Sequence, residues 1–156
     1  MAGPQAKHST RHISGHTTDP ACIFCKIIAG ELPSARVYED NSVLAFLDIS
    51  PIAKGHTLVV PKGHFPTLLD LPESEGKALF KALRLVAGAV KAETGAGGFN
   101  CVQNNFAPAG QVVFHFHIHI VPRFDNDGLP GWPGGRYVDT DEMQQLARSI
   151  SARMGK

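Results

Sequence analysis

The sequence lacks the features that define several large classes of protein. Its apolar runs are too short to span a bilayer, and its first residues contain no apolar segment typical of a secretory signal. The formal net charge is +1, so we expect no electrostatic attraction to a nucleic-acid polymer or an anionic membrane. Three cysteines among 156 residues do not indicate a disulfide framework. We therefore expect one domain in a reducing, cytoplasmic setting.

Histidine, in contrast, is present in an unusual arrangement. His115, His117 and His119 alternate with apolar residues within residues 111–122. A period of two predicts a strand with all three imidazoles on one face. Three imidazoles suit a core poorly, because each buried ring needs partners for two nitrogens, but they suit a reactive surface at neutral pH. The pattern favours an active site over a solvated strand face with accidental histidines.

The remaining patterns predict an α+β domain with an antiparallel sheet of about five strands. Residues 1–19 are polar and are expected to form a flexible tail, and residues 20–156 a single domain with a C-terminal extension. The expected strands cover residues 35–39, 43–47, 56–60 and 99–103 and the histidine segment. The expected helices are a short one over 23–28, a long one over 73–94, and a last one from 139 or 140 to about 154.

Several segments together resemble the histidine triad family of nucleotide hydrolases and transferases. The segment from His115 to Val121 is similar to the family's His-x-His-x-His-x-x motif, in which x is apolar. Residues 22–33, 46–51, 55–62 and 109–111 also look like that family, so the resemblance covers about residues 20–125 in order. It is closest to the small purine-nucleotide-binding branch. This resemblance implies a homodimer in which the sheet continues across a two-fold axis.

The resemblance also implies chemistry at the α-phosphate of a purine nucleoside phosphate of the AMP or GMP type. His117 would attack phosphorus and form a nucleotidyl-histidine, which water then hydrolyses. His119 would bind the phosphate and assist the leaving group, and His115 would complete the reactive face. Three alternatives remain: a dinucleoside polyphosphate hydrolase, a hydrolase that uses the histidines as catalytic zinc ligands, and a nucleotide-binding adaptor with weak catalysis.

Substrate-binding residues follow from the same resemblance. Asp48 would accept hydrogen bonds from the ribose hydroxyls, and Asn104 would bond near the phosphate or ribose, with Asn105 as a close competitor. The other candidates are Phe24, Ile27, Phe46 and Ile49 around the purine, and Gly110, Gln111 and Val113 near the phosphate. Val112 departs from the pattern, because the phosphoramidase branch often has a serine there whose hydroxyl serves the leaving group.

Cys22 and Cys25 form a Cys-x-x-Cys pair, which is a weak zinc signal by itself. A closed zinc site needs four ligands, and the sequence has no second such pair. The resemblance to some bacterial members implies that His64 and His115 complete a structural zinc site. Two buried free thiols are the alternative interpretation.

Four further residues have weaker signals. Cys101 is expected to lie in a strand as a small hydrophobic residue, and His56 to be structural or exposed. Arg123 could meet a phosphate and Trp132 could line a pocket, but the sequence does not decide either point.

Overall fold

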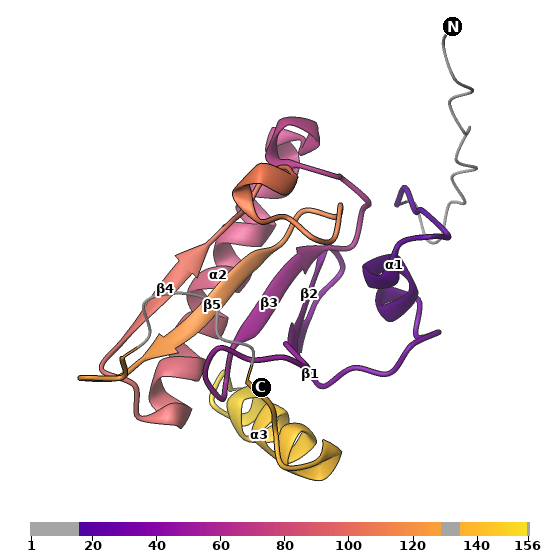
Figure 1. The fold of residues 1–156 in the computed structure, drawn as a ribbon. Helices are drawn as coiled ribbons and strands as arrows, with labels where there is room; N and C mark the ends of the chain where they lie inside the picture. Colours follow the sequence, from indigo (N-terminus) through magenta and orange to yellow (C-terminus); the bar gives the residue numbers. More distant parts are fainter. Residues whose placement is uncertain (1–15, 129–134, 156) are drawn as a thin grey trace, which may run out of the picture.

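The structure is a computed structural model that describes residues 16–128 and 135–155. One antiparallel sheet has the strand order β1-β2-β3-β5-β4. Its strands are β1 (Arg36–Glu39), β2 (Val43–Leu47), β3 (Thr57–Pro61), β4 (Gly98–Val102) and β5 (Ile118–Arg123). The helices are α1 (Ile23–Ile28), α2 (Glu73–Thr94) and α3 (Thr140–Ala152), with short 3₁₀ turns at Leu68–Asp70 and Ala107–Ala109. Figure 1 shows this arrangement, which confirms the predicted α+β class.

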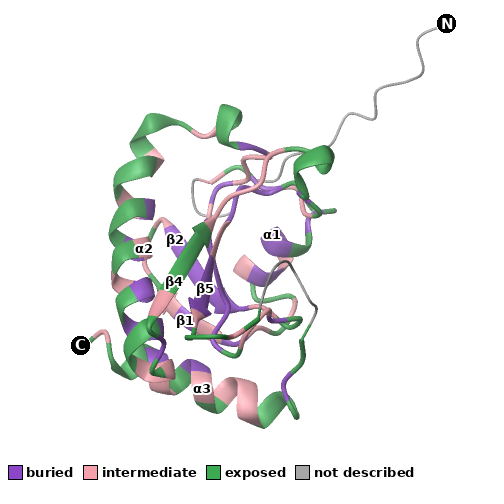
Figure 2. Ribbon diagram, turned by 60° about the vertical axis from the view of Figure 1, so that its left-hand side comes forward, coloured by how far each residue is buried: buried purple, intermediate pink, exposed green. Residues whose placement is uncertain are grey.

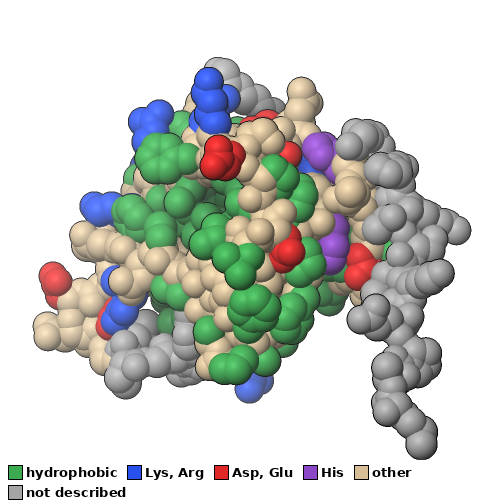
Figure 3. Space-filling view, turned by 90° about the horizontal axis from the view of Figure 1, so that it is seen from above, with side chains coloured by type: hydrophobic (Ala, Val, Ile, Leu, Met, Phe, Trp, Pro, Cys, Tyr) green, Lys and Arg blue, Asp and Glu red, His purple; other side chains and the backbone are tan. Residues whose placement is uncertain are grey.

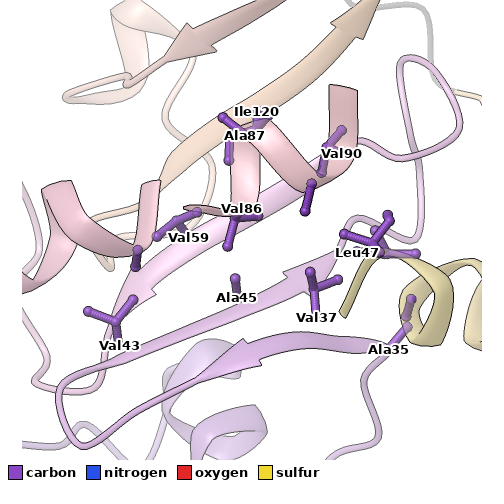
Figure 4. Packing of buried hydrophobic residues seen from close by; sticks show 14 of the residues in the cluster. Ala35, Val37, Val43, Ala45, Leu47, Val59, Val86, Ala87, Val90 and Ile120 are labelled. Carbon is purple, nitrogen blue, oxygen red and sulfur yellow. The ribbon is translucent and has the colours of Figure 1, made fainter. Parts of the chain in front are cut away.

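Both faces of the sheet are covered at β2, which is buried along its whole length. Alternate side chains of a strand point to opposite faces. Val43, Ala45 and Leu47 pack in the core that contains the buried face of α2 (Figure 4). Leu44 and Phe46 pack on the other face, in the cluster that contains α1. Figure 2 shows the buried strands between α2 on one side and α1 on the other.

The two long helices follow their sequence signals. Helix α2 covers the predicted residues and ends at Gly95, whose φ of 69° is left-handed and suits glycine. Asp139 caps α3 by accepting a hydrogen bond from the Glu142 N–H at 2.8 Å. Ala147 and Ile150 of α3 are buried in the same core as α2. Within the described residues, no helix is long and apolar enough to cross a membrane.

The histidine segment differs from the predicted continuous strand. Strand β5 begins at Ile118, so His115 and His117 precede it. The chain departs from the β3 ladder there, because the Phe116 N–H donates to the Phe65 carbonyl at 2.6 Å instead. Phe116 still lies in the α2 core together with Ile120, so the alternation of the two faces continues outside the strand.

Residues 16–19, the last part of the predicted N-terminal tail, contact the domain. Residues 1–15 lie outside the described part of the chain, but residues 16–19 pack against the domain. The carbonyl of Thr17 accepts a 2.8 Å hydrogen bond from the His64 N–H, and Thr18 is buried. Within the described residues, backbone hydrogen bonds therefore hold this polar segment against the domain.

The substitution Ile120→Ala tests the packing of the core between the sheet and α2. Ile120 is fully buried, so the substitution removes buried methyl groups and leaves a cavity. We expect the free energy of unfolding to fall by about 3 kcal/mol in urea titrations with an unchanged slope. Val138→Ala is the control, because this side chain is 82% exposed and its truncation should change little. Equal stability of the two variants would contradict the described core.

Candidate functional site

A cavity of about 410 Å³ lies between α1, the loop that follows β2, and the segment that precedes β5. Its walls are mainly apolar, and its polar lining includes Asp48, His117 and His119. The predicted residues that line it are Phe24, Ile27, Phe46, Asp48, Ile49, Gly110, Val113, His117 and His119. Seen from above, histidine side chains reach the surface beside hydrophobic ones (Figure 3). Apolar walls with a few polar groups are typical of small-molecule sites.

Aromatic packing joins the apolar wall to the histidines. The ring of Phe24 contacts Phe46 edge-on with centroids 5.5 Å apart. The same ring contacts His117 edge-on at 5.2 Å. Helix α1 therefore supplies both a wall of the cavity and a support for the middle histidine.

His117 has a defined tautomer. Its Nδ1 lies 2.6 Å from the carbonyl oxygen of His115, which can only accept, so Nδ1 carries the proton and Nε2 keeps its lone pair. Burial lowers the pKa of His117, and this hydrogen bond partly offsets the effect. The ring is therefore neutral at pH 7, which is the state that a nitrogen nucleophile requires.

His56, which the sequence predicted to be structural or exposed, contacts the cavity-lining His119 without lining the cavity itself. It is buried, and its Nδ1 accepts a 3.1 Å hydrogen bond from the Ile52 N–H, so its proton lies on Nε2. That nitrogen is 2.9 Å from Nδ1 of His119, which must then be the acceptor. His119 consequently carries its own proton on Nε2. Burial, followed by the nearby His117, lowers the pKa of His119 to about 3.

Asp48 lies beside this histidine pair. One carboxylate oxygen accepts from the Ser50 N–H at 2.9 Å, and the other is 3.7 Å from Nε2 of His56. Asp48, His56 and His119 have the composition of a metal site. The Ile52 N–H argues against a cation there, because it occupies Nδ1 of His56 and leaves the proton on Nε2, where a metal would have to bind. We interpret the cluster as a hydrogen-bonded chain.

A second cluster has the geometry of a closed metal site. The ligand atoms of Cys22, Cys25, His64 and His115 all lie within 4.8 Å of one another. Nδ1 of His64 is 3.3 Å from Nδ1 of His115, and the sulfur–nitrogen distances are 3.4–3.6 Å. Bond lengths of about 2.0–2.3 Å to one tetrahedral ion give edges of about 3.3–3.8 Å. The distances therefore fit one ion held by all four residues.

The proton positions fit the same interpretation. Nε2 of His115 donates to the Pro61 carbonyl at 2.9 Å, so its Nδ1 directs a lone pair at the thiols. Asp19 contacts the other two residues of the cluster. Its backbone N–H lies 3.4 Å from Sγ of Cys25, and its carboxylate lies 3.8 Å from Nε2 of His64. A hydrogen bond from Cys25 lowers the pKa of Cys22, which favours a thiolate ligand. These four residues can hold a metal ion.

The side chain of Gln111 is turned away from the cavity and bonds to the preceding loops. It is buried and does not line the cavity. Its oxygen accepts from the Phe106 N–H at 2.7 Å, and its nitrogen donates to the Pro66 carbonyl at 2.6 Å. Phe106 has a φ of 68°, a conformation rare for a side chain of this size. Gln111 therefore shapes the loop before the histidines.

The two asparagines are distinguished by their contacts. Asn105 accepts a 2.8 Å hydrogen bond from the Leu68 N–H and donates to Gln103, so its side chain holds the loop. The amide nitrogen of Asn104 instead lies 3.7 Å from the position that a Cβ on Gly110 would occupy. Asn104 is thus the asparagine whose amide lies beside the cavity-lining Gly110.

The residues with weaker signals lie elsewhere. Arg123 pairs with Asp127 at 2.7 Å and with Asn100 at 2.8 Å, and it does not line the cavity. Cys101 lies in the edge strand β4, as predicted, and it is exposed there. Trp132 lies outside the described residues.

The fold and the site together define a histidine triad protein, with three alternating histidines and an apolar cavity on one face of a five-stranded antiparallel sheet. Residues 29–126 match the family model of the HIT domain. The chain belongs to this family. The match begins after the Cys22–Cys25 pair and ends before α3.

Known relatives agree over most of the chain. "Protein hit" of Bacillus subtilis is 44% identical over 136 residues, which cover 85% of this chain and 94% of the relative. Adenosine 5'-monophosphoramidase HNT1 of Saccharomyces cerevisiae is 36% identical over 148 residues, covering 94% and 90%. The crystal structure of a zinc-bound histidine triad family protein from Mycobacterium smegmatis superimposes with a TM-score of 0.76 at 35% identity, covering 86% and 93%. The chain is similar to an enzyme of the family and to a metal-bound member.

The lowered pKa values predict how stability depends on pH. Burial holds the pKa of His56, His117 and His119 below the usual 6.5, so below that pH the unfolded chain binds protons that the folded chain does not. The contribution of these histidines to stability is therefore fully present above pH 6.5. It decreases as the pH falls toward their pKa values in the folded chain. We expect wild type to lose on the order of 1–2 kcal/mol more than His119→Gln between pH 7 and 5, allowing for solvent screening.

Urea unfolding of both proteins at the two pH values measures this difference. The comparison removes the contribution of the other acid-sensitive groups, among them the cluster of Cys22, Cys25, His64 and His115, because both proteins share them. Equal losses in the two proteins would show that His119 is not held neutral by the fold.

Proposed function

We propose that the protein is a nucleotide hydrolase or nucleotidyl transferase that acts at the α-phosphate of a purine nucleoside phosphate. The observation that carries this proposal is the tautomer of His117, whose unprotonated Nε2 belongs to a cavity-lining, neutral ring. The similarity to an adenosine 5'-monophosphoramidase supports the substrate class.

The cavity offers a place for each part of such a nucleotide. The purine would lie against Phe24, Phe46 and Ile27, since a flat apolar slot favours an aromatic ring. The carboxylate of Asp48 would accept hydrogen bonds from the ribose hydroxyls. Gly110 would let the backbone approach the phosphate, because a glycine has no side chain to block it.

The chain's own groups account for a two-step displacement. Nε2 of His117 would attack phosphorus, forming a P–N bond while the bond to the leaving group breaks. The resulting positive charge on the ring is stabilised by the His115 carbonyl, 2.6 Å from Nδ1. Nε2–H of His119 would donate to the phosphate or leaving atom, and a bound phosphate anion would raise the low pKa of this ring. Water would then attack phosphorus and release His117.

Val112 favours one second candidate, hydrolysis of a dinucleoside polyphosphate. This side chain lines the cavity, is 87% exposed and has no hydroxyl to donate to a leaving amine. A leaving phosphate is stable without such a proton, whereas an amine is not. We therefore propose P–O–P compounds as a second candidate substrate class in addition to phosphoramidates. Parallel assays of turnover with the two classes decide between them.

We further propose that the metal held by Cys22, Cys25, His64 and His115 is zinc with a structural role. Two thiolates and two imidazoles are a common zinc ligand set, and four protein ligands leave no position for water or substrate. When bound, zinc would supply a cross-link and no reaction chemistry. It would join α1, which forms the purine wall, to the segment that carries His117. Thiol ligands suit the reducing, cytoplasmic setting that we propose.

The proposed partner is a second copy of the chain. β4 and β1 are the two edges of the sheet, and β4 is largely exposed along its length. Phe99 on β4 is 41% exposed and Phe80 on α2 is 69% exposed. Pairing of two β4 strands would extend the sheet and cover the unpaired edge.

His117→Asn tests the nucleophile. We expect turnover of adenosine 5′-monophosphoramidate and diadenosine polyphosphate to fall by about a thousandfold or more, because no other described ring has this tautomer and position. AMP should still bind, since the apolar walls and Asp48 remain. Calorimetry measures binding, and mass spectrometry of the quenched wild-type reaction detects the nucleotidyl adduct on His117. His16→Gln is the control, because His16 contacts Asn41 away from the cavity. Wild-type turnover in His117→Asn would rule out this mechanism.

Cys22→Ser combined with Cys25→Ser tests the metal. Metal analysis should find one zinc per wild-type chain and none in the double variant. We expect the free energy of unfolding to fall by about 3–4 kcal/mol, because metal binding is linked to folding. The folded fraction should keep a reduced rate, since His115 then lacks one anchor.

Cys101→Ser is the matched control, because Cys101 is exposed and outside the cluster. Two results together would show that the metal is catalytic. The folded double variant would have no activity, and zinc added to wild-type apo-protein would restore activity without changing its stability.

A further inference from the structure

The loop between β2 and β3 carries Asp48 at its start and His56 at its end. Inside this loop the Ile52 N–H donates to Nδ1 of His56 at 3.1 Å. That bond keeps the His56 proton on Nε2, and through the 2.9 Å contact to His119 it keeps the His119 proton on Nε2 as well. The position of a single peptide group therefore controls two tautomers.

The same peptide group is held on its other side by a residue beyond the family match. The carbonyl of Pro51, which shares a peptide unit with the Ile52 N–H, accepts a 2.8 Å hydrogen bond from the Gly135 N–H. A Cβ on Gly135 would lie 2.3 Å from that oxygen, which is closer than real Cβ atoms come. Glycine is thus required here for steric reasons. A donor at the carbonyl also polarises the peptide and strengthens its N–H as a donor.

Two further contacts connect the same parts of the chain. The buried hydroxyl of Tyr137 accepts a 3.2 Å hydrogen bond from the Gly55 N–H, directly before His56. The carboxylate of Glu142 pairs with the ammonium group of Lys54. Because α3 is anchored in the core, these contacts tie the loop to a fixed support.

We propose that residues 135–142 of the C-terminal extension position the proton chain of the active site. The hydrogen bonds run in one direction, from Gly135 N–H through the Pro51–Ile52 peptide and His56 to Nδ1 of His119. Gly135 and Tyr137 do not line the cavity, so they act as positioning residues. The role of His119 in this inference rests on the proposed nucleotide hydrolase function. The family match ends at residue 126, so this support comes from outside the HIT domain match.

Gly135→Ala tests the proposal in the full-length, zinc-loaded protein. With ¹⁵N-labelled histidine and no nucleotide, wild type should show both His56 and His119 protonated at Nε2. In Gly135→Ala the methyl group displaces the Pro51 carbonyl, so we expect a mixture of tautomers for His56 and His119. Turnover should fall by about tenfold, mainly in kcat with little change in KM, about what one hydrogen bond contributes.

Gly76→Ala is the matched control, because an added Cβ there meets nothing within 4 Å. It should retain the wild-type tautomers and rate. If Gly135→Ala fails to fold, Tyr137→Phe replaces it, since it removes only the acceptor of the Gly55 N–H and should give the same shift to a lesser degree.

The tautomer and turnover measurements distinguish failure of the positioning role from failure of the proposed nucleotide hydrolase function. Wild-type tautomers and turnover within about twofold in a folded variant would overturn the positioning role, because a lost hydrogen bond should cost more. Absence of nucleotide turnover in the wild-type protein would overturn the proposed function instead, and the tautomers would still decide whether the extension controls His56 and His119.

Discussion

Nδ1 of His117 donates a 2.6 Å hydrogen bond to the carbonyl of His115, while the ring of His115 faces two thiols and His64. One residue therefore joins the predicted metal cluster to the predicted nucleophile. The segment that carries both histidines lies before β5 and lacks its ladder hydrogen bonds. Its position depends on the hydrogen bonds from His115 to Pro61 at the end of β3 and from Phe116 to Phe65. The orientation of His117 follows from these anchors.

Burial has a chemical consequence beyond stability. The ordinary pKa of histidine would leave a fraction of each ring charged near neutral pH. In the folded chain desolvation lowers the pKa of His56, His117 and His119, so these rings are neutral. Nε2 of His56 can therefore lie 2.9 Å from Nδ1 of His119. Neutral rings have one donor and one acceptor nitrogen each, which makes a directed chain of hydrogen bonds possible. The apolar contact with Phe24 and the hydrogen-bond chain thus support the same protonation state.

The sequence predicted much of this molecule. The alternation at residues 115–119 placed the three imidazoles on one face, and the apolar spacing defined α2 over the residues that the structure shows. The resemblance brought together the four metal-cluster residues and most of the cavity lining. It did not predict the end of the β3–β5 ladder or the internal role of the Gln111 side chain. Both depend on hydrogen bonds to residues 65 and 66, which lie about fifty positions away.

Local periodicity by itself determined which side chains share a face, because strand and helix repeats are properties of neighbouring residues. It could not determine which nitrogen of His115 or of His119 carries the proton. That is decided by single partners distant in sequence: Pro61 for His115, and His56 for His119, 63 positions away. Gly135 is the extreme case, since in sequence it belongs to a stretch rich in glycine and proline that carries no signal of a hydrogen-bonding role. The tertiary structure places its N–H against the Pro51 carbonyl, and a hydrogen bond exists only once the fold has brought donor and acceptor together.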